Sequence, residues 1–270
     1  MKRAPLLLAA LSLVALSLAA CGGSRPAAVA GAASPVSGPV TAPNFGDRKP
    51  HPWDGRAPSA YAVHGTDTSR YQPPVDWVTA RANGINFTFI KATEGAEDAD
   101  PMFQQHWTAA RAAGVATGAY HFWYHCAPGR AQAQNFIRRV PKARGALPPV
   151  LDLEWTPFSP TCTRRPPQAE LLAEAQIFLD TVARHYGQMP LVYVSPDIFA
   201  SHELWRLRGV EFWVRSVAGH PSKVYPGTRW TFWQYSGTGQ IPGKAGDGDL
   251  NVFAGSRAAW QAWLARRAHP

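Results

Sequence analysis

The chain has 270 residues and carries 27 Lys and Arg against 18 Asp and Glu, which gives a net charge of +9. A basic surface favours anionic partners. The positive charges form no block and no nucleic-acid-binding motif is present, which argues against nucleic acid as the partner. An anionic cell wall is the simpler partner for an exported protein.

Residues 1–20, MKRAPLLLAALSLVALSLAA, start with positive charges and continue as an uncharged apolar run. The run is short for a membrane-spanning helix, which needs about 20 apolar residues, so it indicates an export signal. Cys21 follows the small residues that end the run, which resembles the signal of bacterial lipoproteins, whose cysteine carries the lipid. An ordinary signal peptide with a chance cysteine is the alternative. Loss of the signal removes Lys2 and Arg3 and leaves a net charge of +7.

The next segment, residues 21–60, is rich in Ala, Pro, Gly and Ser and has almost no apolar periodicity. Such a segment cannot bury enough surface to offset its ordering entropy. We therefore expect a disordered linker that tethers a domain to a membrane anchor, on the periplasmic or cell-surface side. Residues 61–267 remain, which is enough for one domain with a large core.

Within this domain, short β-like segments alternate with helical segments. Strands are expected at 61–67, 85–92, 115–123, 148–155, 189–195, 210–216, 229–236 and 248–253. Helices are expected at 75–83, 100–114, 129–140, 167–187 and 256–267, the second capped by Asp100 and the fourth ended by Gly187. The alternation predicts a parallel sheet, and eight strands in about 205 residues predict its closure. The fold class is therefore α/β, an irregular TIM-like barrel with regular βα units first and β-only connections near the C-terminus.

Two carboxylates interrupt the apolar strand VLDLEW, residues 150–155. Asp152 and Glu154 are two positions apart, so in a strand both point to one face, roughly 6.6 Å apart along the chain. They lie at the carboxyl end of the strand, where barrels of this kind have their active sites. Burial and mutual repulsion raise one pKa, which suits glycoside hydrolysis. The alternative is a strand end whose acids face solvent or cap the next helix.

Acids also end other expected strands, and a barrel would bring these strand ends to one mouth. Asp67 ends the first strand, Glu94 follows the second, and Asp249 lies in the last. Aromatic residues lie at or near strand ends, where some would stack on sugar rings and others would pack the core: Tyr120, Trp123, Trp155, Tyr193, Trp213 and Trp233.

Taken together, these residues resemble the family 25 glycoside hydrolases, the N,O-diacetylmuramidase type of lysozyme. The matching stretches follow the family's order: HGTDTSRYQPPVDW (64–77), FIKATEG (89–95), AGVATGAYHF (113–122), PPVLDLEW (148–155), PLVYVS (190–195), FWVRS (212–216) and WTFWQYSGTGQIPGKAGDGDLNVF (230–253). The resemblance implies an irregular barrel and hydrolysis of the β-1,4 bond between N-acetylmuramic acid and N-acetylglucosamine in peptidoglycan. It implies no cofactor and no metal, and we expect a monomer.

The resemblance also implies roles for individual residues. Glu154 matches the general acid, and Asp152 matches the partner that stabilises the positive centre or orients the acetamido group. Asp67 and Asp249 match supporting acids. Substrate contacts are expected from Glu94, Tyr120, Tyr193, Trp213 and Trp233. An enzymatic nucleophile and substrate assistance both remain open.

Two features depart from the family's pattern. The family often has a small residue and an aromatic after the Trp of this strand, whereas the run here is WVRSVAGHP, so Arg215 is expected to alter a sugar subsite. Cys126 and Cys162 fall outside the motifs and follow the third and fourth strands, which should be neighbours. An exported compartment permits disulfides, so we expect these two cysteines to pair and to brace two loops beside the cleft.

Three other interpretations fit the sequence less well. A chitinase of family 18 would need a longer acidic series, but residues 148–151 are PPVL. An inactive peptidoglycan-binding lipoprotein would not need the acid pair, and a structural lipoprotein would leave all four acids unexplained.

The stretches SHELWR (201–206) and DGDLN (247–251) each lack ligands that a zinc or calcium site needs.

Overall fold

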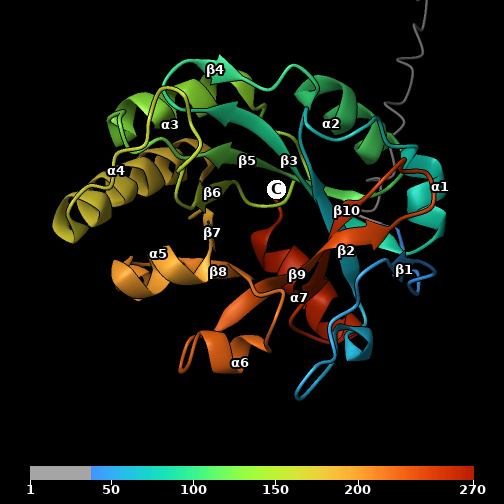
Figure 1. Ribbon diagram of the computed structural model, residues 1–270. Coiled ribbons are helices and arrows are strands. Elements are labelled where there is room, and N and C mark those ends of the chain that lie inside the picture. Colours follow the sequence, from blue (N-terminus) through green and yellow to red (C-terminus); the bar gives the residue numbers. More distant parts are fainter. Residues whose placement is uncertain (1–37) are drawn as a thin grey trace, which may run out of the picture. The chain divides into compact units, whose positions relative to one another are not determined.

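The computed structural model describes residues 38–270 (Figure 1). The predicted export signal, the predicted lipidation at Cys21 and residues 21–37 of the predicted linker lie outside the described residues. Within residues 38–270, no helix is long and apolar enough to cross a membrane.

Eight strands form a closed barrel in the described part of the chain. They are β2 (His64–Thr68), β3 (Ile85–Glu94), β5 (Ala116–Phe122), β6 (Val150–Leu153), β7 (Leu191–Val194), β8 (Glu211–Arg215), β9 (Trp230–Gln240) and β10 (Gly248–Phe253). Neighbouring strands pair in this order, and β9 closes the circuit because it pairs with both β8 and β10. The predicted TIM-like barrel is confirmed.

The connections differ between the two parts of the barrel. All pairs from β2 round to β9 are parallel, whereas β10 is antiparallel to both β9 and β2. The helices are α1 (Trp77–Ala82), α2 (Phe103–Ala112), α3 (Gly129–Arg139), α4 (Gln168–Tyr186), α5 (Pro196–Ser201), α6 (Pro221–Val224) and α7 (Arg257–Arg267). The one helix between β8 and β9 is the four-residue α6, and no helix lies between β9 and β10. The predicted loss of long crossover helices near the C-terminus is confirmed, although α5 and α6 were not predicted.

Local chemistry explains where the helices start and stop. Asp76 caps α1 by accepting hydrogen bonds from the backbone N–H groups of Val78 and Thr79. Gly187 ends α4 in the left-handed region at φ 75°, as its position in the sequence predicts. Asp100 accepts from the N–H of Met102 but does not itself cap α2, which begins at Phe103.

Side chains that alternate along each strand form two apolar layers. In β6, Val150 belongs to the core inside the barrel, whereas Leu151 and Leu153 belong to the core between the strands and the outer helices. Two tryptophans of α7, Trp260 and Trp263, join the inner core. Trp260 packs on Phe87, near the amino end of β3, with ring centroids 5.7 Å apart. Helix α7 therefore covers the end of the barrel opposite the carboxyl ends of the parallel strands.

The segment before the barrel is ordered further upstream than the sequence predicts. Strand β1 (Gly46–Asp47) pairs with β9, and Thr41 exchanges hydrogen bonds with the side chain of Asn86. Trp53 packs on Trp233 at a centroid distance of 4.9 Å. The prediction of a disordered linker is therefore wrong for residues 38–60. A few anchoring residues hold this segment against the barrel, although it otherwise has few apolar side chains. A second short strand, β4 (Asp98–Ala99), pairs with the end of β3.

Candidate active site

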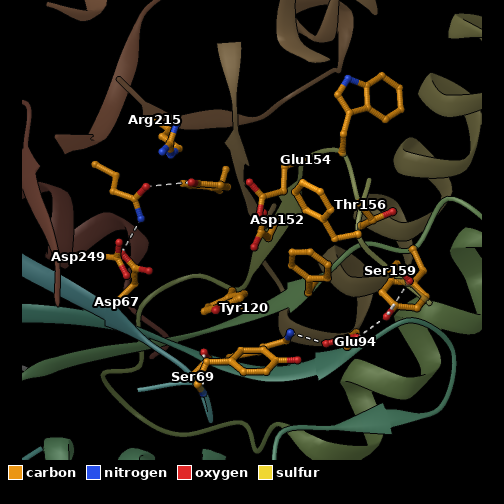
Figure 2. Close-up of a pocket in the computed structure, with 18 of the residues that line it drawn as sticks. Asp67, Ser69, Glu94, Tyr120, Asp152, Glu154, Thr156, Ser159, Arg215 and Asp249 are labelled. Atoms are coloured by element: carbon orange, nitrogen blue, oxygen red, sulfur yellow. Dashed lines mark hydrogen bonds and ion pairs between the residues drawn. The ribbon is translucent and has the colours of Figure 1, made fainter. Parts of the chain in front are cut away.

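A cleft of about 530 Å³ opens at the carboxyl ends of the parallel strands (Figure 2). All five predicted acids line it. Asp67 and Glu94 lie near the carboxyl ends of β2 and β3, Asp152 and Glu154 lie at the end of β6, and Asp249 lies near the start of the antiparallel β10. The residues that line the cleft and were singled out from the sequence are Asp67, Glu94, Tyr120, Asp152, Glu154, Trp155, Tyr193, Trp213, Arg215 and Asp249. Closure of the sheet brings together side chains that are up to 182 positions apart in the sequence, as for Asp67 and Asp249.

Strand β6 aims its acids into the cleft because its inward side chains alternate with apolar outward ones. Asp152 lies within β6, and Glu154 directly follows its last residue. Asp152 is buried, and its Oδ1 atom has no hydrogen-bond partner within residues 38–270. Burial raises the pKa of Asp152, and the charge of Glu154 raises it further. Burial also raises the pKa of Glu154, which is half-buried, while the charge of Arg215 opposes this shift.

A second acid pair, Asp67 on β2 and Asp249 on β10, lies across the cleft (Figure 2). Asp67 Oδ2 accepts hydrogen bonds from Asn251 Nδ2 at 2.7 Å and from Gln234 Nε2 at 3.0 Å. Burial, and then the charge of Asp249, raise the pKa of Asp67 to about 8. Burial also raises the pKa of Asp249, which accepts a hydrogen bond of 2.8 Å from Gln72 Nε2. Near neutral pH, Asp67 is therefore mostly protonated.

Aromatic side chains hold the amides that bind Asp67. Tyr193 donates its hydroxyl to Gln234 Oε1 at 2.9 Å, and Trp213 Nε1 donates to Asn251 Oδ1 at 2.8 Å. These bonds fix the orientation of both amides, so each presents its N–H to the acid. Neither Gln234 nor Asn251 was predicted from the sequence. Their signal was present, because each is an amide side chain between two large apolar or aromatic residues of its strand.

Residues 66–244 match the family model described as glycosyl hydrolases family 25. The chain belongs to this family. A lysozyme M1 from Streptomyces globisporus is 33% identical over 213 residues, which are 73% of this chain and 69% of that protein. A family 25 glycosyl hydrolase from Bacillus anthracis superposes with a TM-score of 0.69 at 29% identity, over 80% of this chain and 98% of that structure. A bacterial lysozyme from Streptomyces coelicolor gives a TM-score of 0.66 at 32% identity, over 75% and 96% respectively. The predicted family and the predicted glycoside hydrolase class are confirmed.

A further acid of this family 25 enzyme, Glu94 at the end of β3, has a different environment from the others. Lys91 donates to its carboxylate, and Tyr124 donates its hydroxyl to Glu94 Oε1 at 2.5 Å. Arg70 lies 3.7 Å from the same carboxylate. Burial alone would raise the pKa of Glu94, but these donors outweigh it and leave the pKa below its usual value. Glu94 is therefore a fixed anion at the edge of the cleft and is unsuited to donating a proton.

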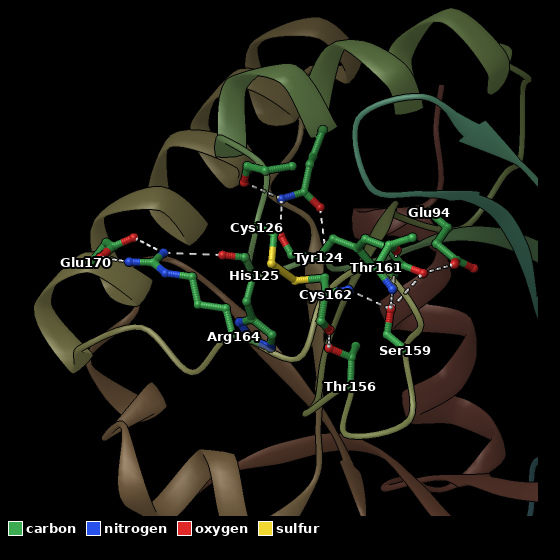
Figure 3. Close-up of a disulfide and its surroundings, with 12 residues drawn as sticks. Glu94, Tyr124, His125, Cys126, Thr156, Ser159, Thr161, Cys162, Arg164 and Glu170 are labelled. Carbon is green, nitrogen blue, oxygen red and sulfur yellow. Dashed lines mark hydrogen bonds and ion pairs between the residues drawn. A yellow bond between two sulfur atoms is a disulfide. The ribbon is translucent and has the colours of Figure 1, made fainter.

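A disulfide joins Cys126 to Cys162, as predicted, with Cα atoms 5.8 Å apart (Figure 3). It ties the loop after β5 to the loop after β6. The second of these loops, residues 156–160, forms one wall of the cleft. Ser159 accepts a hydrogen bond of 3.0 Å from the N–H of Cys162 and lies 3.5 Å from the Tyr124 hydroxyl, which in turn binds Glu94. The sequence predicts a braced loop beside the cleft, but it does not predict that residues 156–160 line the cleft, because these residues match no motif.

The structure contradicts the predicted sugar contact of Trp233. Its side chain is fully buried, and its Nε1 atom donates to the backbone oxygen of Ser216 at 2.8 Å. The physical reason is strand alternation: Phe232 and Gln234 of β9 point into the barrel, so Trp233 points to the outer core. Trp123 is likewise buried in the outer core, whereas Trp155 reaches the cleft.

Exposed aromatic side chains at the rim of the cleft were also missed. Phe158 is 96% exposed and Tyr71 is 73% exposed, and both line the cleft. Within residues 38–270, no group of three or more His, Cys, Asp or Glu side chains is arranged to hold a metal ion.

Proposed function

We propose that this protein is a muramidase that hydrolyses the β-1,4 bond between N-acetylmuramic acid and N-acetylglucosamine in peptidoglycan, with Glu154 as its general acid. The observation that carries the proposal is the pair Asp152 and Glu154 at the mouth of the barrel, both with raised pKa values. Two relatives are named lysozyme M1 and N,O-diacetylmuramidase, which supports the same activity here.

In the active enzyme the acid pair holds one proton, because two charges in this buried space would repel each other. The productive state has the proton on Glu154, which is the more exposed of the two acids and therefore reaches the bound glycan. Glu154 gives this proton to the glycosidic oxygen, the bond from that oxygen to C1 of muramic acid breaks, and the N-acetylglucosamine side leaves with a free hydroxyl.

Positive charge then develops at C1 of muramic acid, and the Asp152 carboxylate is the group that counters this charge. Its Oδ1 atom lacks a partner in the described residues, so it is free to accept a hydrogen bond from the acetamido N–H of the substrate. A charged Asp152 in this position either stabilises C1 directly or orients the acetamido oxygen to attack it. Water then adds hydroxide to C1, and its second proton returns to the Glu154 carboxylate.

The remaining acids position the substrate and the pair. Asp67 and Asp249 form the opposite wall, and Tyr120 and Glu94 complete the floor and edge. We place the glycan strand along the cleft, with Phe158 and Tyr71 stacked on sugar rings at its rim, because an exposed aromatic face beside a carbohydrate cleft offers an apolar contact surface.

We further propose that the protein is exported and anchored to a membrane through lipid on Cys21, as residues 1–21 suggest. Residues 22–37 would then span from the anchor to the ordered segment. This location gives the enzyme continuous access to the cell wall.

The test compares wild-type protein, residues 22–270, with Glu154→Gln on purified peptidoglycan. We expect the wild type to release muramic acid reducing ends and the variant to lose this activity by at least a thousandfold. Glu97→Gln is the matched control, because Glu97 is an exposed acid that does not line the cleft. Retained wall binding with no release from the wild type would instead show an inactive binding protein.

A further inference from the structure

Arg215, the last residue of β8, lines the cleft and is exposed to it. Within residues 38–270, its guanidinium takes part in no ion pair and no hydrogen bond; only its backbone oxygen does, accepting from the Tyr225 hydroxyl at 2.7 Å. In Figure 2 its nitrogen atoms face the space between Asp249 and Glu154. The guanidinium group, which has five N–H donors, therefore points into the cleft without a hydrogen-bond partner among the described residues.

The other cation of the cleft lining is already neutralised. Lys91 is 3% exposed, and its ammonium is paired with Glu94. Glu154 and Asp249 flank Arg215 in Figure 2 but form no ion pair with it, and burial raises the pKa values of both acids. Among the described residues, the cleft therefore holds one unpaired positive charge, on a side chain long enough to reach the glycan.

The chemistry of the glycan offers one matching group. N-acetylglucosamine carries no charge, whereas muramic acid carries a lactyl ether at O3 that ends in a carboxyl group. This carboxyl is free when the glycan has no peptide, and it is an amide when a stem peptide is attached, in which case the peptide supplies carboxylates of its own. A guanidinium binds a carboxylate through two parallel hydrogen bonds.

Resting on the muramidase function proposed above, we infer that Arg215 is a specificity-determining residue that binds a carboxylate carried on O3 of muramic acid. One guanidinium matches the charge and the planar geometry of a single carboxylate. If the ligand is the free lactyl carboxylate, the preferred glycan is the product of an amidase that removes stem peptides. If it is a peptide carboxylate, the preferred glycan still carries its peptides.

The experiment measures kcat/KM for the wild type, Arg215→Met and Arg208→Met on three glycans. The first glycan has been stripped of peptides and has free lactyl carboxylates, the second is the same material with these carboxylates converted to methylamides, and the third retains its peptides. Arg208 is the matched control, because it is exposed and lies outside the cleft. Arg215→Met also changes the charge beside Glu154, so the informative quantity is the ratio between glycans for one variant.

We expect the wild type to prefer a carboxylate-bearing glycan over the methylamide glycan by at least tenfold, mainly through KM, and Arg215→Met to abolish this preference. If Arg215→Met lowers kcat/KM only on the stripped glycan, the bound group is the lactyl carboxylate. If it lowers kcat/KM only on the peptide-bearing glycan, the bound group is a peptide carboxylate. Equal effects of Arg215→Met on all three glycans, or no effect, overturn the inference.

A binding measurement separates this inference from the muramidase proposal. Glu154→Gln and the double variant Glu154→Gln/Arg215→Met are compared for binding to the stripped, methylamide and peptide-bearing glycans by calorimetry. Weaker binding of the double variant to a carboxylate-bearing glycan, with unchanged binding to the methylamide, supports the role of Arg215 even if the wild type cleaves none of the three. Identical binding by both proteins overturns it.

Discussion

Gln234 donates a hydrogen bond of 3.0 Å to Asp67 across the inside of the barrel, although the two residues are 167 positions apart. Asn251 donates to the same carboxylate oxygen at 2.7 Å. Both bonds favour the charged form of Asp67, yet burial and the neighbouring Asp249 dominate and raise its pKa to about 8. The folded protein therefore binds a proton at Asp67 over a pH range in which the unfolded chain releases it.

This difference makes Asp67 a source of pH-dependent instability. Because the folded pKa is the higher one, stability is greatest below the unfolded pKa, near 3.8, and falls as the pH rises towards about 8. Asp67→Asn cannot ionise, and its carbonyl oxygen can still accept from Gln234 and Asn251. We expect the variant to melt at a higher temperature than the wild type at pH 8 and to lose most of this advantage at pH 4. Thermal melts at both pH values check this, with Asp180→Asn on α4 as the control. An advantage of equal size at both pH values would contradict it.

The charge of Arg215 should set the alkaline limit of activity. Its cation favours the carboxylate form of Glu154 and so opposes the upward pKa shift that burial causes. Without this cation the pKa of Glu154 rises, and the protonated, active form persists to higher pH. We expect Arg215→Met to move the alkaline limb of the kcat/KM profile to higher pH. The profile is measured on the methylamide glycan, which has no lactyl carboxylate for Arg215 to bind. A limb that stays in place or moves to lower pH would show that Arg215 does not act on Glu154.

Much of the fold was predictable because the barrel strands are short apolar runs and the helices carry local capping signals. The position of Asp152 and Glu154 at the mouth followed from the two-residue period of β6. Trp233 was expected to contact sugar because it lies near a strand end, but the sequence does not say which face of β9 points inward. The ordered segment before residue 61 was missed because Phe45 and Trp53, two anchors among small residues, barely change the composition of the segment.

The wall formed by residues 156–160 depends on a long-range covalent bond, so no local pattern could reveal its shape. The Cys126–Cys162 disulfide closes a loop over a sequence separation of 36 residues. A cross-link of this span is expected to stabilise the fold by about 3 to 4 kcal/mol, through the entropy of the unfolded chain. We expect Cys126→Ser/Cys162→Ser to lower the free energy of unfolding by roughly this amount in urea titrations. Wild-type protein unfolded in the presence of a reductant should show a similar decrease in the free energy of unfolding. An unchanged urea midpoint in both experiments would argue that the loop is held by its other contacts alone.

Substitution of Phe158 tests whether the wall formed by residues 156–160 contacts the glycan. The side chain is 96% exposed, so Phe158→Ala should leave the thermal stability unchanged while removing one stacking surface at the rim. A stacking contact of about 0.5–1.5 kcal/mol corresponds to a rise in KM of roughly two- to tenfold, with kcat nearly constant. Phe158→Trp should retain the wild-type KM, because an indole offers at least the same face. Trp205→Ala is the matched control, since Trp205 is half exposed and lies outside the cleft. If Phe158→Ala and Trp205→Ala have the same KM on long glycan strands, the glycan does not extend over this wall, and the cleft ends at Glu94 and Tyr124.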